Sequence, residues 1–100
     1  MFKVGDIIRI KTKKELLKDV PKSDHPQGFV RTGDNCSFNI EMLEYTGLTT
    51  KITNIKSVWS GSNSYPRYVI HADSGNWAWH EDFLKKTNLF RLKDSLFSLE

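Results

Sequence analysis

Apolar and polar residues alternate over short stretches of this chain, which favours β-strands joined by turns over long helices. The first stretch covers Ile7 to Lys11, where Ile8 and Ile10 share one parity and the charged residues share the other. This pattern predicts a strand with one buried face and one solvated face. Gly5 and Asp6, directly before it, are typical of a tight turn.

A short helix is predicted after this strand. Thr12 and Glu15 have the spacing of a capping box, which predicts a helix over Lys13–Lys18. Leu16 and Leu17 would be the residues that this helix buries. The polar residues that follow it read as an exposed loop.

A second short helix is predicted over Ile40–Tyr45, with Asn39 as its N-terminal cap and Gly47 as its C-terminal stop. Its apolar residues, Met42 among them, would contribute to the core. Between the two helices, residues 29–31 are too few to assign, and residues 32–35 read as a turn.

The most continuous β pattern covers residues 49–72. Thr49–Trp59 is rich in Thr, Ile and Val and is predicted to be a strand. Because two of its isoleucines fall on opposite parities, a bulge is expected near Asn54. A flexible loop over Ser60–Ser64 would lead to a second strand over Tyr65–Ala72, where Pro66 indicates an edge position.

A hairpin turn at Asp73–Asn76 is predicted to lead into a strand at Trp77–His80, with both tryptophans on one face. Glu81–Leu84 then predicts a single helical turn that folds its two apolar residues back onto the sheet. Later leucines recur every three or four residues. Residues 85–100 are therefore expected to be either a tail or a docked amphipathic helix.

The opening string Phe2-Lys3-Val4-Gly5-Asp6-Ile7-Ile8-Arg9-Ile10 resembles the first strand of SH3-like barrels, as in Mind-bomb/HERC2 repeats and KOW-type modules. Three later segments, Met42 through Gly47, Arg67 to Ile70 and Trp77-x-Trp79, are similar to a group of small proteins from bacteriophage and gut-bacterial genomes. The resemblance covers residues 2–84. It implies a mainly β, SH3-like small barrel over residues 1–84 with one or two short helical inserts. It implies a fold more than a function, because SH3-like barrels host many activities.

The composition fits one soluble domain. One hundred residues suffice for a single core, and no apolar run approaches the roughly 20 residues of a membrane span. The N-terminus lacks the apolar core of a secretory signal, and Cys36 is alone, which fits a reducing compartment. We therefore expect a cytoplasmic protein, in the host cytoplasm if a phage encodes it.

The positive charge is concentrated near the N-terminus. Residues 1–35 hold eight Lys and Arg against five Asp and Glu, whereas residues 36–100 hold seven of each. A nucleic-acid-binding barrel could use this patch for phosphates. The alternative is a solvated helix beside a strand kept soluble by lysines, and the small net charge of +3 favours it. The patch residues are Arg9, Lys11, Lys13, Lys14 and Lys18.

Few residues have the spacing that catalysis or metal binding requires. His71 and His80 flank the predicted hairpin and could approach each other, with Asp82 as a third ligand, but no zinc-type spacing is present. Cys36 has no adjacent base and is expected to fill space near Phe38. We therefore expect a protein that is not an enzyme and that uses no metal or other cofactor.

Aromatic residues are the more informative set, since five of them fall between positions 59 and 79. Some of them must build the core, Tyr68 and one tryptophan among them, whereas the others could form a recognition surface. The candidate binding residues are Trp59, Tyr65, Arg67, Trp77 and Trp79. We expect an interaction module that binds a protein or peptide, as a monomer or weak homodimer, with nucleic acid as the alternative partner.

Overall fold

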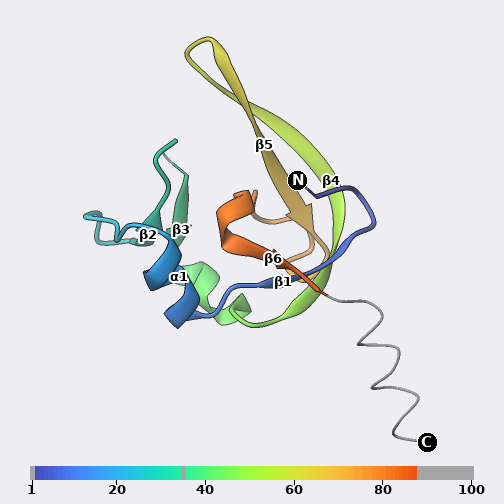
Figure 1. The fold of residues 1–100 in the computed structure, drawn as a ribbon, viewed down its shortest axis with the longest axis horizontal. Helices are drawn as coiled ribbons and strands as arrows, with labels where there is room; N and C mark the ends of the chain where they lie inside the picture. The colour runs from blue at the N-terminus through green and yellow to red at the C-terminus, as the bar shows by residue number, and fades with distance from the viewer. Residues whose placement is uncertain (1, 35, 88–100) are drawn as a thin grey trace, which may run out of the picture.

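The computed structural model describes residues 2–34 and 36–87, and over these residues the chain is a mainly β protein (Figure 1). The main sheet has four antiparallel strands in the order β5-β4-β1-β6, and β2 and β3 form a separate two-stranded sheet. The strands are β1 (Ile7–Ile10), β2 (Gly28–Arg31), β3 (Ser37–Asn39), β4 (Thr49–Ser60), β5 (Asn63–Ile70) and β6 (Leu84–Lys86). The helices are α1 (Lys13–Asp19) and two 3-10 helices, η1 (Ile40–Tyr45) and η2 (Glu81–Phe83). The main sheet curls into a half-barrel, which confirms the predicted fold class of a small, mainly β barrel with short helical inserts.

The first strand forms where the alternation predicts it. Ile8 and Ile10 are fully buried, and the turn before the strand uses Gly5 at a φ of +96°. β1 lies inside the main sheet, where it pairs with β4 on one side and with β6 on the other.

The helix α1 begins at the predicted capping box. The Glu15 amide donates to Thr12 Oγ1 at 3.3 Å, and the Thr12 amide donates to Glu15 Oε1 at 3.1 Å. Leu16 is fully buried, but Leu17 is 45% exposed, so the prediction that both are buried is wrong. Successive residues on a helix point about 100° apart, and one face of this short helix packs on the core.

The second helix also has its predicted bounds, as the 3-10 helix η1. Met42 is buried, and its Sδ accepts the Asn39 amide at 3.3 Å. Gly47 follows the helix at a φ of +80°, a left-handed conformation in which glycine avoids the penalty of a side chain.

The two longest described strands, β4 and β5, form a hairpin. Its register shifts between Ile52 and Asn54, which confirms the expected bulge, and β5 is an edge strand, as Pro66 indicates. The predicted flexible loop at 60–64 is wrong, because Ser60 pairs with Asn63 across a two-residue turn. Residues 57–66, which we call the hairpin arm, extend away from the rest of the protein (Figure 1).

The segment after β5 forms the predicted turn at Asp73–Asn76, where the Asn76 amide donates to the Asp73 carbonyl at 3.1 Å, but the strand expected after the turn does not form. Trp79 forms only an isolated bridge with Tyr68, so residues 77–80 are not a strand. The Asp73 carboxylate organises a wider loop instead. It accepts the Gly75 amide at 3.0 Å, the Trp77 amide at 3.0 Å and the Trp79 indole N–H at 2.9 Å.

An aromatic core closes the half-barrel. Phe38 packs edge-on against Trp79 and Phe83 at centroid distances of 5.4 Å and 5.1 Å. The predicted helical turn is η2, which buries Phe83 and is followed by the buried Leu84. Leu84 begins β6, so the sheet continues past the expected end of the barrel at residue 84. The tail prediction for residues 88–100 lies outside the described residues.

Candidate binding groove

An ion-pair cluster joins three segments that are distant in the sequence. Arg67 Nη2 on β5 lies 3.3 Å from Asp34 Oδ2 in the turn between β2 and β3. His80 Nε2, just before η2, lies 3.1 Å from Asp34 Oδ1. The Arg67 and Asp34 side chains are 6% and 15% exposed, so solvent screens their attraction only in part.

The pKa values of Asp34 and of the nearby Cys36 are both shifted by their surroundings. Burial alone would raise the pKa of Asp34, but the hydrogen bond from Thr32 and the positive charges of His80 and Arg67 outweigh it, so the pKa is lowered. Asp34 is therefore ionised at neutral pH. Burial raises the pKa of the Cys36 thiol, which packs against the core near Phe38 in the role expected for it.

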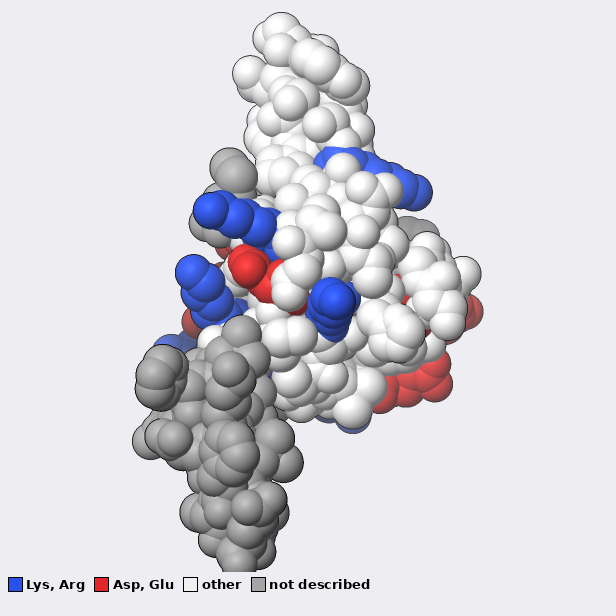
Figure 2. Space-filling view, turned by 90° about the vertical axis from the view of Figure 1, so that its right-hand side faces the viewer, with Lys and Arg blue, Asp and Glu red and all other residues white. Residues whose placement is uncertain are grey.

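A pocket of about 430 Å³ lies between this cluster and the hairpin arm. Its polar wall comes from the β2–β3 hairpin, and its apolar wall comes from Val58 and Trp59 on β4. Trp59 is 70% exposed and Val58 is 42% exposed. The sequence 57–66 contains no charged residue, and the projecting arm at the top of Figure 2 is correspondingly free of charged side chains.

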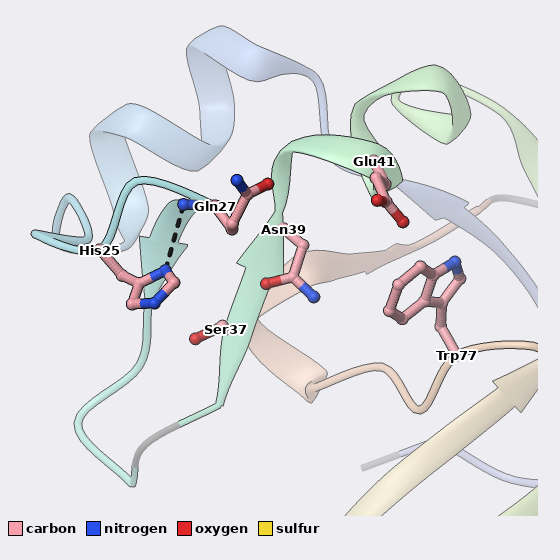
Figure 3. A pocket seen from close by; sticks show the side chains of 6 residues that line it. All are labelled: His25, Gln27, Ser37, Asn39, Glu41 and Trp77. Atoms are coloured by element: carbon pink, nitrogen blue, oxygen red, sulfur yellow. Dashed lines mark hydrogen bonds between the residues drawn. The ribbon is translucent and has the colours of Figure 1, made fainter.

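A second pocket of about 510 Å³ adjoins the first (Figure 3). Ser37 and Asn39 line both pockets, because their side chains project from β3 on the face opposite the buried Phe38. Trp77 and Glu41 also line the second pocket. We call the two pockets, which share Ser37 and Asn39, the β3 groove. Its lining residues are His25, Gln27, Asp34, Cys36, Ser37, Asn39, Glu41, Val58, Trp59, Arg67 and Trp77.

The predicted binding residues fall in different places. Trp59 and Arg67 line the first pocket and Trp77 lines the second, whereas Tyr65 is half-buried opposite Val58. Trp79 is fully buried in the core, so the structure removes it from the contact surface.

Several residues that line the groove were not predicted as site residues from the sequence. Asp34 read only as a turn residue, and Ser37 and Asn39 lie on a three-residue strand that is too short for a periodic signal. The partners of Asp34 are 33 and 46 residues away. A local pattern carries no information on contacts at that separation.

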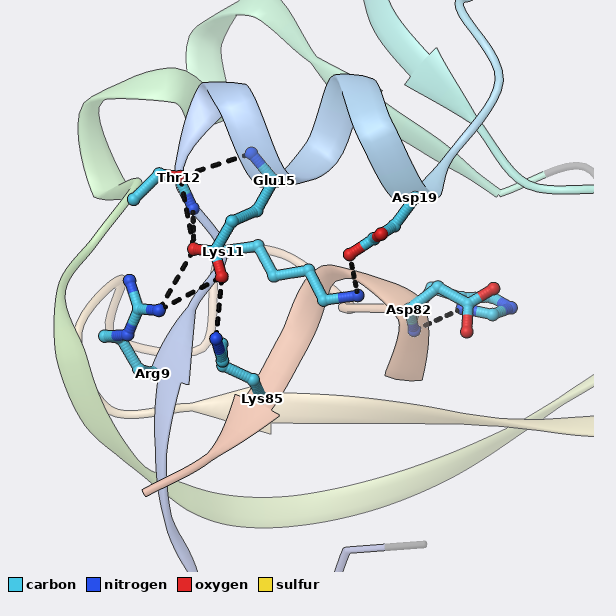
Figure 4. Close-up of polar contacts among 8 residues, drawn as sticks. Arg9, Lys11, Thr12, Glu15, Asp19, Asp82 and Lys85 are labelled. Atoms are coloured by element: carbon cyan, nitrogen blue, oxygen red, sulfur yellow. Dashed lines mark hydrogen bonds and ion pairs between the residues drawn. The ribbon is translucent and has the colours of Figure 1, made fainter. Parts of the chain in front are cut away.

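The N-terminal basic patch is partly neutralised by acids on α1 (Figure 4). Arg9 pairs with Glu15 at 3.0 Å, and Lys85 reaches the same carboxylate at 2.7 Å. Lys11 pairs with Asp19 at 3.1 Å. The other patch lysines, at 13, 14 and 18, are exposed on α1. Two of the five predicted phosphate contacts therefore already have partners within the fold.

These ion pairs predict a pH-dependent stability. The hydrogen bond from Lys85, with help from Thr12 and Arg9, lowers the pKa of Glu15 from 4.5 to about 2. Because folding lowers the pKa of Glu15, its ionised carboxylate stabilises the fold above about pH 4.5. This stabilisation is lost as the pH falls towards 2 and the carboxylate becomes protonated. Since the Glu15 side chain is 27% exposed, screening reduces its contribution to about 1 kcal/mol.

Glu15→Gln should therefore lose about 1 kcal/mol at pH 7 in urea unfolding, while glutamine keeps the capping geometry. The difference from the unmodified chain should shrink below pH 4.5 and vanish near pH 2. Asp24→Asn, in an exposed loop, is the matched control. A deficit in Glu15→Gln that stays constant from pH 7 to pH 2 would contradict the assignment.

The two histidines named as possible metal ligands have different environments. His71 is exposed in the turn after β5, whereas His80 contacts Asp34 and accepts the Asp82 amide through Nδ1 at 2.8 Å. Across residues 2–34 and 36–87, no group of three or more His, Cys, Asp or Glu is placed to hold a metal ion. In the same part of the chain, no helix is long and apolar enough to cross a membrane.

The fold and the groove together define a small, mainly β domain with an open surface groove between two hairpins. Comparison with known protein families, curated proteins and solved structures gives no match. The resemblance to SH3-like barrels therefore depends on the sequence motifs alone.

Proposed function

We propose that this chain is a non-catalytic interaction module that binds a protein or peptide segment in the β3 groove, with Trp59 as its main contact. The observation that carries the proposal is the 70% exposure of Trp59 on an uncharged arm beside a pocket. Tryptophan is the residue type most enriched at binding hot spots, where a large ring becomes buried on contact. The motifs similar to SH3-like proteins of phage and gut bacteria are compatible with such a module acting in the cytoplasm.

The groove combines features that a peptide site requires. One wall is apolar, the other presents hydroxyl and amide groups, and the Asp34–Arg67 pair joins β5, at the base of the arm, to the turn before β3. A rigid wall lowers the entropic cost of binding, since the site needs little ordering on contact.

The test is a selection of linear peptides from a phage-displayed random library on the full chain. Trp59→Ala should weaken the selected peptides at least tenfold in direct titration, because truncation removes the hot spot. The melting temperature should change by less than about 3 °C, since the side chain is exposed. Leu17→Ala, which truncates a 45% exposed side chain on α1, should leave binding unchanged.

Two outcomes would overturn the proposal. One is the failure of any peptide to enrich, and the other is equal affinity of the selected peptides for Trp59→Ala and the unmodified chain. Nucleic acid is tested in parallel with a labelled single-stranded oligonucleotide at increasing salt. Tight binding that falls steeply with salt and is lost when Lys13, Lys14 and Lys18 become Ala would favour the nucleic-acid alternative instead.

A further inference from the structure

The strand β3, whose Ser37 and Asn39 side chains line both pockets, pairs with β2 along one edge. The Thr32 amide donates to the Cys36 carbonyl, and the Ile40 amide donates to the Gln27 carbonyl, both at 2.9 Å. Even-numbered residues of this segment therefore direct their backbone groups towards β2, and Ser37 and Asn39 direct theirs away from it. The Asn39 amide already donates to Met42 Sδ at 3.3 Å, so the groups available to an added strand are the Ser37 amide and the carbonyls of Ser37 and Asn39. Among the described strands, β2 is the only neighbour of β3, so the other, outer edge of β3 has no strand partner.

The outer edge of β5, on the arm side of the groove, offers fewer backbone groups for pairing with an added strand. Pro66 has no amide hydrogen to donate, and its carbonyl accepts Arg67 Nη1 at 2.9 Å. Nearer the body, the Tyr68 backbone is paired with Trp79 in both directions at 2.8 Å. An added strand therefore finds more free backbone groups on β3 than on β5.

The second pocket adds a preference for positive charge. In Figure 3 the carboxylate of Glu41 and the six-membered ring of Trp77 point into the same hollow. Glu41 is exposed and forms no ion pair with any described residue, whereas Asp34 in the first pocket is already paired with Arg67 and His80. A carboxylate beside an indole attracts a Lys or Arg side chain through both charge and the aromatic face.

Building on the proposed function, we propose that the β3 groove binds an extended peptide that pairs with the outer edge of β3 and places a Lys or Arg side chain between Trp77 and Glu41. Side chains of an added strand alternate between faces, so the peptide contributes a basic residue to one pocket and an apolar residue beside Trp59. The main-chain pairing supplies affinity, and the two pockets supply the sequence preference.

The first test uses peptides selected on the full chain. They should carry a Lys or Arg at a fixed distance from an apolar residue, and Glu41→Gln should weaken them about 5- to 20-fold. Glu44→Gln is the matched control, because Glu44 lies on the same 3-10 helix outside the groove lining. It should leave their affinity unchanged.

The second test addresses the backbone pairing. Single N-methylation at successive positions of one selected peptide should weaken binding at least tenfold at alternate positions and little in between, because every second amide faces β3. An irregular or uniform dependence would overturn the strand pairing.

Failure of this inference is distinguishable from failure of the proposed function. One outcome would overturn only the basic pocket and support the binding module. In it, the selected peptides lack basic residues, Trp59→Ala weakens their binding and Glu41→Gln leaves it unchanged. If neither variant changes the affinity, both the module at this groove and the basic pocket are wrong.

Discussion

Replacing Trp79 by Ala should lower the free energy of unfolding by about 3–5 kcal/mol, the largest effect that we expect from any single substitution. Trp79 is fully buried and packs edge-on against Phe38 at 5.4 Å and Tyr45 at 6.1 Å. Its removal leaves a cavity at the centre of the half-barrel. It also removes the hydrogen bond that the indole N–H donates to the buried Asp73 carboxylate.

The measurement is urea unfolding followed by circular dichroism, with Trp59→Ala as the matched control. The same truncation on the arm should cost less than about 0.5 kcal/mol, because Trp59 is 70% exposed. A loss of 3 kcal/mol corresponds to a fall in melting temperature of at least about 12 °C in a domain of this size.

Trp79→Phe separates the two causes of this loss. Phenylalanine keeps an aromatic ring in the core but donates no hydrogen bond to Asp73, so its cost should be intermediate, about 1–3 kcal/mol. Equal stability of the Trp79→Ala and Trp59→Ala variants would contradict the core position of Trp79.

The contrast between these two tryptophans also shows where sequence reasoning stops. The capping box of α1, the bulge at β4 and the turn of η2 depend on residues within a few positions of one another, and all three were predicted correctly. Burial of Trp79 depends on Phe38, which lies far away in the sequence. The parity of Trp77 and Trp79 placed them on one face but did not tell which of them is buried.

The candidate site was predictable only in part for the same reason. Trp59 was among the candidate binding residues, and its 70% exposure leaves that prediction open to test. The groove itself requires β3 and the arm to lie close together, and Asp34 and Arg67, which pair at 3.3 Å in the lining of the first pocket, are 33 positions apart in the sequence. No local pattern identified β3 or β6, because a three-residue strand is too short to show periodicity.

Asp34→Ala should cost about 2–4 kcal/mol, even though the residue lies in a turn at the protein surface. The substitution leaves the Arg67 guanidinium, 6% exposed, without its carboxylate partner, and an unpaired charge at that depth is poorly solvated. Asp24→Asn, in the exposed loop before β2, is the control and should be nearly neutral.

The pairing is isolated by adding Arg67→Met to the Asp34→Ala variant. Methionine removes the stranded charge and keeps an apolar stem, so the double variant should recover about 0.5–3 kcal/mol of the loss. Because the pKa of Asp34 is lowered in the fold, its stabilisation is present at neutral pH and is lost as the pH falls through that lowered value. The deficit of Asp34→Ala should therefore shrink in acid. If the double variant is no more stable than Asp34→Ala at pH 7, the ion pair does not hold the arm against β3, and the groove must be positioned by backbone contacts alone.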